Sequence, residues 1–135
     1  GWLYSAFGNH FVKTIQRLTV EREQLNVVFD QVGTPTYAAD LATSIVHAIE
    51  TGKYRQHQGI YHFSNEGVCS WYDFAKEIVA ITGANCKVNP VTTEEYPSKV
   101  KRPAYSILDK TKIKETFNLE IRDWREALKS CMATF

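Results

Sequence analysis

The stretch Asp30-Gln31-Val32-Gly33-Thr34-Pro35-Thr36-Tyr37-Ala38-Ala39-Asp40-Leu41-Ala42 decides how this chain folds. It joins a short apolar run, residues 25–29, to an amphipathic helix that is predicted to begin near Thr36. Gly33 permits a backbone turn that other residues resist, and Pro35 fixes its own φ. The result is a stiff loop beside a helix N-terminus, where free N–H groups suit a phosphate or a polar sugar. A capped turn without any ligand explains the same residues.

Helical periodicity and strand-forming runs alternate along the rest of the chain. Helices are predicted within residues 10–23, 36–51, 70–82, 109–117 and from 123 onward, and strands within residues 2–4, 25–29, 59–64 and 86–91. Capping boxes are predicted for Ser70 with Asp73 and for Asp123 with Glu126. The order predicts an α/β fold around a small sheet, or α+β if the strands pair antiparallel.

Composition narrows the class of protein. The 135 residues carry a net charge of +1, which suggests neither nucleic acid nor an anionic membrane as a partner. No apolar run approaches the roughly 20 residues that span a bilayer. The three cysteines form no zinc pattern, so free thiols in a reducing cytoplasm are expected, and the histidines show no metal-ligand spacing. The abrupt start at Gly1, without Met, predicts a piece of a longer protein.

Two motifs could carry chemistry. Tyr72 and Lys76 form a Tyr-x-x-x-Lys, which on one helix face suits acid–base work on a carbonyl. No Gly-rich dinucleotide fingerprint accompanies it, so a chance match is the better interpretation. Arg102, held by Pro103, offers a planar fork of donors for a phosphate or carboxylate, although a solvated basic loop is an equal alternative. Trp2 could stack on a sugar ring or pack in the core.

Several stretches together resemble the dTDP-4-dehydrorhamnose reductase family. They are Gly1-Trp2-Leu3-Tyr4-Ser5, Phe11-Val12-Lys13-Thr14, residues 30–36, Gly59-Ile60-Tyr61-His62-Phe63-Ser64-Asn65, Ser70-Trp71-Tyr72-Asp73, Arg102-Pro103 with Ser106 and Leu108, and Trp124-Arg125 with Leu128-Lys129. The resemblance covers essentially all 135 residues. It implies the C-terminal part of a Rossmann-like, extended short-chain dehydrogenase/reductase: a substrate-binding portion with a small mixed sheet and surrounding helices.

The resemblance also implies an activity. Such enzymes reduce the 4-keto group of dTDP-6-deoxy-L-lyxo-4-hexulose with NADPH or NADH to give dTDP-L-rhamnose. The N-terminal dinucleotide-binding domain, with the Gly-rich loop and the catalytic residues, would precede residue 1. This portion alone is therefore expected to be inactive and to bind no cofactor. Some members bind Mg²⁺, for which no ligands are placed in this chain. An apolar face left by the missing domain invites homodimerisation.

By position, the resemblance places seven residues at the nucleotide-sugar cleft: Trp2, Gln31, Pro35, Thr36, Arg102, Pro103 and Ser106. His10 stands where an Asn is expected, so this chain departs from the family pattern there. Two other functions remain open. One is a non-catalytic regulatory subunit with a reductase-like fold, of the kind that binds methionine adenosyltransferase. The other is a related nucleotide-sugar reductase or epimerase.

Overall fold

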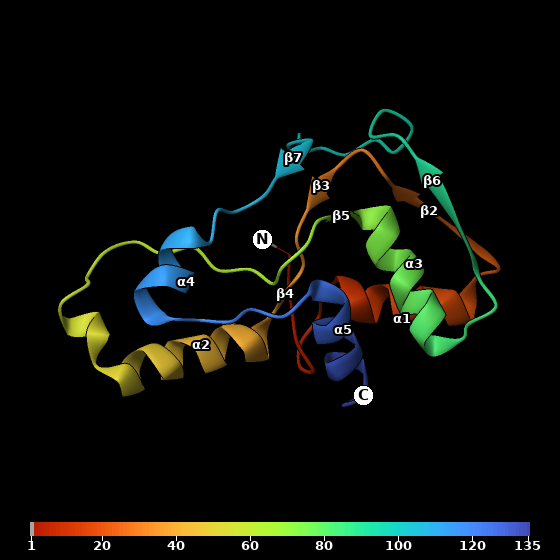
Figure 1. Ribbon diagram of the computed structural model, residues 1–135. Helices are drawn as coiled ribbons and strands as arrows, with labels where there is room; N and C mark the ends of the chain where they lie inside the picture. Colours follow the sequence, from red (N-terminus) through yellow and green to blue (C-terminus); the bar gives the residue numbers. More distant parts are fainter. Residues whose placement is uncertain (1) are drawn as a thin grey trace.

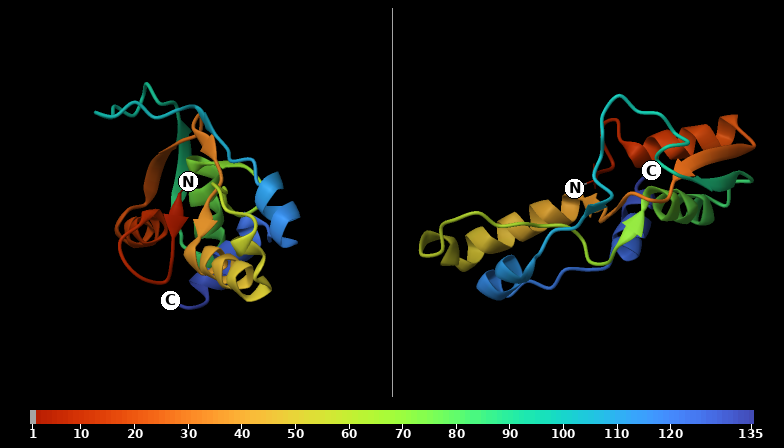
Figure 2. Two further views of the ribbon diagram at one scale, coloured as in Figure 1. Left: turned by 90° about the vertical axis from the view of Figure 1, so that its left-hand side faces the viewer. Right: turned by 90° about the horizontal axis from the view of Figure 1, so that it is seen from above.

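The computed structural model describes residues 2–135 and has an elongated shape (Figure 1). The helices are α1 (Phe11–Glu21), α2 (Ala38–Thr51), the short 3₁₀ helix η1 (Lys53–Arg55), α3 (Trp71–Thr82), α4 (Thr111–Phe117) and α5 (Trp124–Met132). The strands are β1 (Leu3–Tyr4), β2 (Gln24–Val28), β3 (Val32–Gly33), β4 (Thr36–Tyr37), β5 (Cys69–Ser70), β6 (Lys87–Val91) and β7 (Tyr105–Ser106). Helices α1, α3 and α5 gather at one end, and α2 with α4 extends from it as an arm (Figure 2).

The strands form three small sheets in the described residues, where one sheet of three or four strands was predicted. β1 pairs with β4 and β2 with β6, both parallel. β3 lies between antiparallel β5 and parallel β7. The mixed α/β class is therefore confirmed. The predicted strand at residues 59–64 is wrong, because no neighbouring segment within residues 2–135 forms a ladder with it. A strand needs that partner to satisfy its backbone groups.

The core is built around Phe74 of α3, which is buried. Its ring packs against Tyr4 at 5.6 Å, Phe11 at 5.4 Å and Trp124 at 5.9 Å between ring centroids. These aromatic contacts join β1, α1 and α5 to one helix, and each buries a large apolar area. The core therefore fixes the position of β1, which pairs with β4 at the end of the loop that follows β3.

Helix α2 departs most from its prediction. By helical spacing, one apolar face of this helix carries Tyr37, Leu41, Ile45 and Ile49, yet Ile45 and Ile49 are 53% and 57% exposed. The helix also begins two residues later than predicted, because Thr36 and Tyr37 form β4 instead. The polar side of α2 faces the rest of the protein, to which it is hydrogen-bonded as described below.

Local capping rules predict the helix ends well. Ser70 accepts a hydrogen bond from Asp73 N at 3.0 Å, and Asp73 Oδ2 accepts one from Ser70 N, which confirms the first capping box. Asp123 accepts from Arg125 N at 2.9 Å, so it caps α5. A complete capping box would also have the Glu126 side chain accept a hydrogen bond from Asp123 N. That bond is absent from the described residues, so the predicted second capping box is wrong in that respect.

The three cysteines are buried and free. Burial raises the pKa of the Cys69 thiol to about 12 and that of Cys131 to about 11. A thiol with so high a pKa is a poor nucleophile at neutral pH. Within residues 2–135, no helix is both long and apolar enough to cross a membrane.

His10 makes the chain sensitive to mild acid. Its Nε2 lies 2.6 Å from Ser5 O, and its buried Nδ1 has no partner in the described part of the chain. Protonation would therefore place an unmatched charge beside the Tyr4 ring and near Lys13. Burial accordingly lowers the His10 pKa below the ordinary value of about 6.5. Stability from neutral His10 is full above that value and falls as pH drops below it. Melting temperatures between pH 7.5 and 5.5 should fall, and His10→Gln should flatten that decline; an unchanged slope contradicts the assignment.

Candidate functional site

Strand β3 brings two predicted loops together. Val32 pairs with Tyr105 and Gly33 with Ser106 in parallel register, and Val32 N donates to Ala104 O at 2.8 Å. The stretch at 31–36 therefore lies beside the loop at 102–106, although about 70 residues separate them in the sequence (Figure 1). The pairing creates one continuous surface from segments that sequence reasoning could link only through a family resemblance.

Gly33 permits the closest approach in this surface. A Cβ added to Gly33 would lie 2.9 Å from Trp2 Cζ2 and 3.0 Å from Ser106 O. The Trp2 ring stacks on Trp71 at 3.7 Å between centroids with planes 18° apart, and Phe11 packs on Trp71 at 4.7 Å. Only glycine fits between β7 and the Trp2 ring, so Trp2, β3 and β7 form one tightly packed unit.

The seven predicted contact residues fall into two groups. Gln31, Pro35 and Thr36 are buried, and Gln31 donates through Nε2 to Thr93 Oγ1 at 3.3 Å. Their side chains shape the floor under the loop. Arg102, Pro103 and Ser106 are exposed on the opposite loop, and Trp2 is half-buried with its ring against Gly33. All seven remain predicted ligand contacts.

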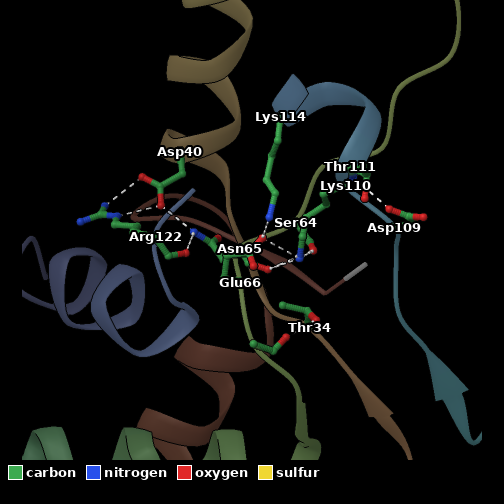
Figure 3. A network of polar contacts seen from close by, with 11 residues as sticks. Thr34, Asp40, Ser64, Asn65, Glu66, Asp109, Lys110, Thr111, Lys114 and Arg122 are labelled. Atoms are coloured by element: carbon green, nitrogen blue, oxygen red, sulfur yellow. Dashed lines mark hydrogen bonds and ion pairs between the residues drawn. The ribbon is translucent and has the colours of Figure 1, made fainter. Parts of the chain in front are cut away.

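A buried polar network behind the loop was missed by the sequence reasoning (Figure 3). Asn65 is fully buried; its Oδ1 accepts from Tyr37 N at 2.8 Å, and its Nδ2 donates to Asp40 Oδ2 at 2.7 Å. The Arg122 guanidinium donates two hydrogen bonds to the Asp40 carboxylate, from Nε to Oδ2 at 2.8 Å and from Nη2 to Oδ1 at 2.9 Å. This paired geometry is the strong form of a carboxylate–guanidinium contact, and its hydrogen bonds raise the Arg122 pKa.

The same network continues to α4. Lys110, which is buried, donates through Nζ to Ser64 Oγ at 3.2 Å and to Asn65 O at 3.0 Å. Its Nζ also lies 3.3 Å from Glu66 Oε1, which accepts a bond from Lys114 at 3.1 Å. Burial alone would raise the Glu66 pKa, but the two lysines outweigh it and lower the pKa. A buried ammonium is thus matched by a carboxylate and two oxygens.

Thr34 connects the loop after β3 to the segment that carries Asn65 and Glu66. Its Oγ1 donates to Gly67 O at 2.7 Å, so the turn after Glu66 and the loop after β3 are tied together (Figure 3). The signal in the sequence is the polar run Asn65-Glu66-Gly67, whose composition predicts only a turn. Nothing in the sequence pointed to Arg122 as the partner of Asp40, 82 positions away.

A groove of about 510 Å³ lies between α2 and the segment that leads into α5. Asp40, Ser44 and His47 line one wall, and Asn118 to Arg122 line the other. None of the seven predicted contact residues borders this groove. Within residues 2–135, no group of three or more His, Cys, Asp or Glu side chains is arranged to hold a metal ion.

The Tyr72 and Lys76 pair lies on α3, with Lys76 Nζ 5.5 Å from the centre of the Tyr72 ring. The ammonium therefore lies over the ring face, an ordinary cation–π contact between neighbours on a helix. Asp73, between them in sequence, is engaged in the Ser70 capping box.

Comparison with known proteins decides the family. A family model described as "RmlD substrate binding domain" matches residues 1–135. The chain belongs to this family. The match includes Gly1, which lies outside the described residues.

Similar proteins include two curated relatives at 43% identity. One is the spore coat polysaccharide biosynthesis protein SpsK of Bacillus subtilis, matched over 95% of this chain and 43% of that protein. The other is the dTDP-4-dehydrorhamnose reductase of Aggregatibacter actinomycetemcomitans, matched over 98% of this chain and 48% of that protein. The chain spans about half the length of the curated relatives it matches.

Solved structures agree with this RmlD assignment. The dTDP-4-dehydrorhamnose reductase of Bacillus anthracis in complex with NADP matches with a TM-score of 0.87 at 42% identity, over 98% of this chain and 45% of that one. The UDP-glucose 4-epimerase of Thermotoga maritima matches with a TM-score of 0.73 at 20% identity, over 99% of this chain and 43% of that one. The second likeness shows a shared fold alone. The predicted fold class, α/β of the kind found in Rossmann-like reductases, is confirmed.

Proposed function

We propose that residues 1–135 are the C-terminal, substrate-binding portion of an NAD(P)H-dependent dTDP-4-dehydrorhamnose reductase. The observation that carries this is the family match along the whole chain, with relatives of that name at 36–43% identity. An N-terminal dinucleotide-binding domain would complete the protein. The coverage of about half of each relative supports this division.

The whole protein would reduce the 4-keto group of dTDP-6-deoxy-L-lyxo-4-hexulose to give dTDP-L-rhamnose. NADPH or NADH would supply the hydride. This chain has no Gly-rich dinucleotide loop, so cofactor binding belongs to the N-terminal domain. The role of this portion is to hold the nucleotide-sugar in a fixed orientation, which contributes to rate through proximity rather than chemistry.

The proposed binding surface is the one organised by β3. Arg102 has the geometry for the diphosphate, and the Ser106 hydroxyl is on the same exposed loop. Trp71 already covers one face of Trp2, so a sugar ring would use the part of the indole that Trp71 leaves free. Gln31, Pro35 and Thr36 form the floor, and the buried Thr36 Oγ1 has no hydrogen-bond partner among residues 2–135.

The activity is tested with the full parent reading frame and with the 135-residue chain. We expect the full protein to oxidise NADPH or NADH when given the 4-keto sugar nucleotide, and the 135-residue chain to show no turnover. A full protein that consumes UDP-sugars but not this substrate would favour the related reductase or epimerase. A parent sequence without a Gly-rich loop and catalytic Tyr-x-x-x-Lys would favour the non-catalytic subunit.

Arg102→Ala in the full protein should raise KM about 10- to 150-fold while kcat stays within about 3-fold. Removal of one charge-assisted hydrogen bond to phosphate costs about 1.5–3 kcal/mol of binding that ground state and transition state share. Steady-state kinetics with varied sugar nucleotide measure both constants. Arg22→Ala, which removes an exposed arginine after α1, is the matched control and should leave KM unchanged. An unchanged KM for Arg102→Ala argues against a substrate role.

We also propose a cytoplasmic location, because the three cysteines are free thiols, which a reducing compartment maintains. Homodimerisation through an exposed apolar face is expected of the 135-residue chain at high concentration. Static light scattering over a concentration series measures this association. Mg²⁺ dependence is assigned to no residue of this chain.

A further inference from the structure

Trp71 lies against Trp2, the one aromatic side chain among the seven predicted contact residues. The two rings are stacked, with their centroids 3.7 Å apart and their planes 18° apart. Both side chains are half-buried, so part of the pair remains accessible to a ligand. Stacked aromatic rings attract one another beyond the effect of the apolar area that they bury, so the orientation of one ring constrains the orientation of the other.

Trp71 is itself held from three directions. Strand β5 ends directly before it and pairs antiparallel with β3. The capping box of Ser70 and Asp73 fixes the first turn of α3, which begins at Trp71. The Phe11 ring of α1 packs on the Trp71 ring at 4.7 Å between centroids. Trp71 therefore offers the Trp2 indole a fixed surface that belongs to the sheet and to two helices.

The backbone of Trp2 is in a conformation that needs support. Its φ is 32°, in the left-handed region that bulky residues rarely adopt. Such strain persists only where the surroundings hold the residue in place, and strained positions cluster at ligand-binding sites. Thr36 N donates to Trp2 O at 3.0 Å, which fixes the backbone after Trp2. The direction of the indole is then set by two close neighbours, the Trp71 ring and the backbone of Gly33.

We propose that Trp71 is a positioning residue for the sugar half of the nucleotide-sugar, and that it acts through Trp2. The proposal rests on the proposed function for the identity of the ligand. Trp2 meets the sugar ring with the free part of its indole, and Trp71 sets the angle of that indole. Without Trp71 the indole turns away and the sugar loses its contact. The diphosphate, which Arg102 binds on the other loop, keeps its own contact.

Isothermal titration calorimetry on the full parent protein tests the proposal with two probes. dTDP-L-rhamnose carries a sugar ring, and dTDP has the same base and diphosphate without it. We expect Trp71→Leu to raise the Kd of dTDP-L-rhamnose about 10-fold and to leave the Kd of dTDP within about 2-fold. Trp71→Phe keeps a flat ring, so both Kd values should stay within about 3-fold of those of the unchanged protein. The matched control is Phe117→Leu, which replaces a buried aromatic residue of α4 and should change neither Kd.

A double-mutant cycle shows whether Trp71 acts through Trp2. Trp2→Leu, Trp71→Leu and the double variant are titrated with dTDP-L-rhamnose. If Trp71 only orients Trp2, the double variant binds no more than about 2-fold more weakly than Trp2→Leu alone, because there is no indole left to orient. Fold-changes that multiply would mean that Trp71 acts independently of Trp2, which overturns the proposal. Trp71→Met, which also lacks a ring, replaces Trp71→Leu in both experiments if that variant does not fold.

The two probes also separate this proposal from the proposed function. Equal weakening of both probes by Trp71→Leu identifies a merely structural residue, and unchanged binding of dTDP-L-rhamnose shows that the stack does not orient the sugar; both results overturn the proposal. A selective loss of dTDP-L-rhamnose in a protein without reductase activity rejects the proposed function and keeps the role of Trp71. If the unchanged protein binds neither probe, the proposed substrate is wrong and UDP-glucose is compared with UDP. A selective loss of UDP-glucose keeps the role, whereas equal losses or no binding overturn it.

Discussion

Asn65→Ala is expected to lower the free energy of unfolding of this chain by about 3 kcal/mol. Asn65 is completely buried, and its amide bonds to Tyr37 N, Asp40 Oδ2 and Arg122 O. Truncation leaves the Tyr37 N–H without its acceptor, takes a donor from the Asp40 carboxylate and opens a cavity. Each buried group left unpaired costs about 1–3 kcal/mol.

Urea denaturation at pH 7 measures this loss. The matched control is Asn26→Ala, which removes an exposed asparagine whose Oδ1 accepts from Asn89 Nδ2 at 3.3 Å; its effect should stay below about 0.5 kcal/mol. Asn65→Asp keeps the shape of the side chain but sets a second carboxylate against Asp40, so it should destabilise the chain as well. A change below about 1 kcal/mol for Asn65→Ala would show that water or relaxation replaces the lost bonds.

The position of Asn65 explains why so large an effect is expected. Its three partners belong to β4, α2 and the segment that enters α5, and its own carbonyl accepts from Lys110 beside α4. One side chain therefore connects the arm of the molecule to its core (Figure 3). The loop after β3 depends on the same connection, because Thr34 is bonded to Gly67 two residues further on.

Local rules predicted the features that depend on nearby residues. The Ser70 capping box needs only the spacing from Ser70 to Asp73, and Gly52 and Gly83 end their helices in the left-handed conformation. Features that depend on distant partners were not predicted. The apolar face of α2 has correct helical spacing, but periodicity does not tell whether its cover lies within this chain. The predicted strand at 59–64 is wrong for the same reason: its composition does not tell whether residues 2–135 contain a strand to pair with it.

The candidate site shows the same division. Gly33 and Pro35 identified the loop after β3 from local chemistry, and Arg102 with Pro103 identified the second loop. Their pairing through β3 and β7 follows from three-dimensional register, which the residues alone did not give. The Asp40–Arg122 pair is still harder to predict from the sequence, because nothing in it distinguishes Arg122 from the other arginines as the partner of that carboxylate.

Gly33→Ala is expected to reduce stability by about 2 kcal/mol and, in the full protein, to raise KM for the sugar nucleotide by about 10-fold. The new Cβ would lie 3.0 Å from Ser106 O and 2.9 Å from Trp2 Cζ2. Ser106 O is a backbone atom of β7 and cannot rotate away, and the Trp2 ring is held by Trp71. The strain is relieved by separation of β3 from β7, which moves the loop that carries Arg102.

The two readouts of Gly33→Ala separate packing from binding. Denaturant unfolding of the 135-residue chain reports the packing cost, and KM of the full protein reports the displaced loop. Gly83→Ala is a useful comparison: a Cβ there meets open space, so its cost comes from the left-handed φ of 68° alone and KM should not change. Gly33→Ala should cost less stability in a Trp2→Ala background than in the unchanged chain, because one of the two close contacts is absent there, while KM stays high. If Gly33→Ala left both stability and KM unchanged, the β3–β7 register would not be what positions the loop, and Arg102 would need another support.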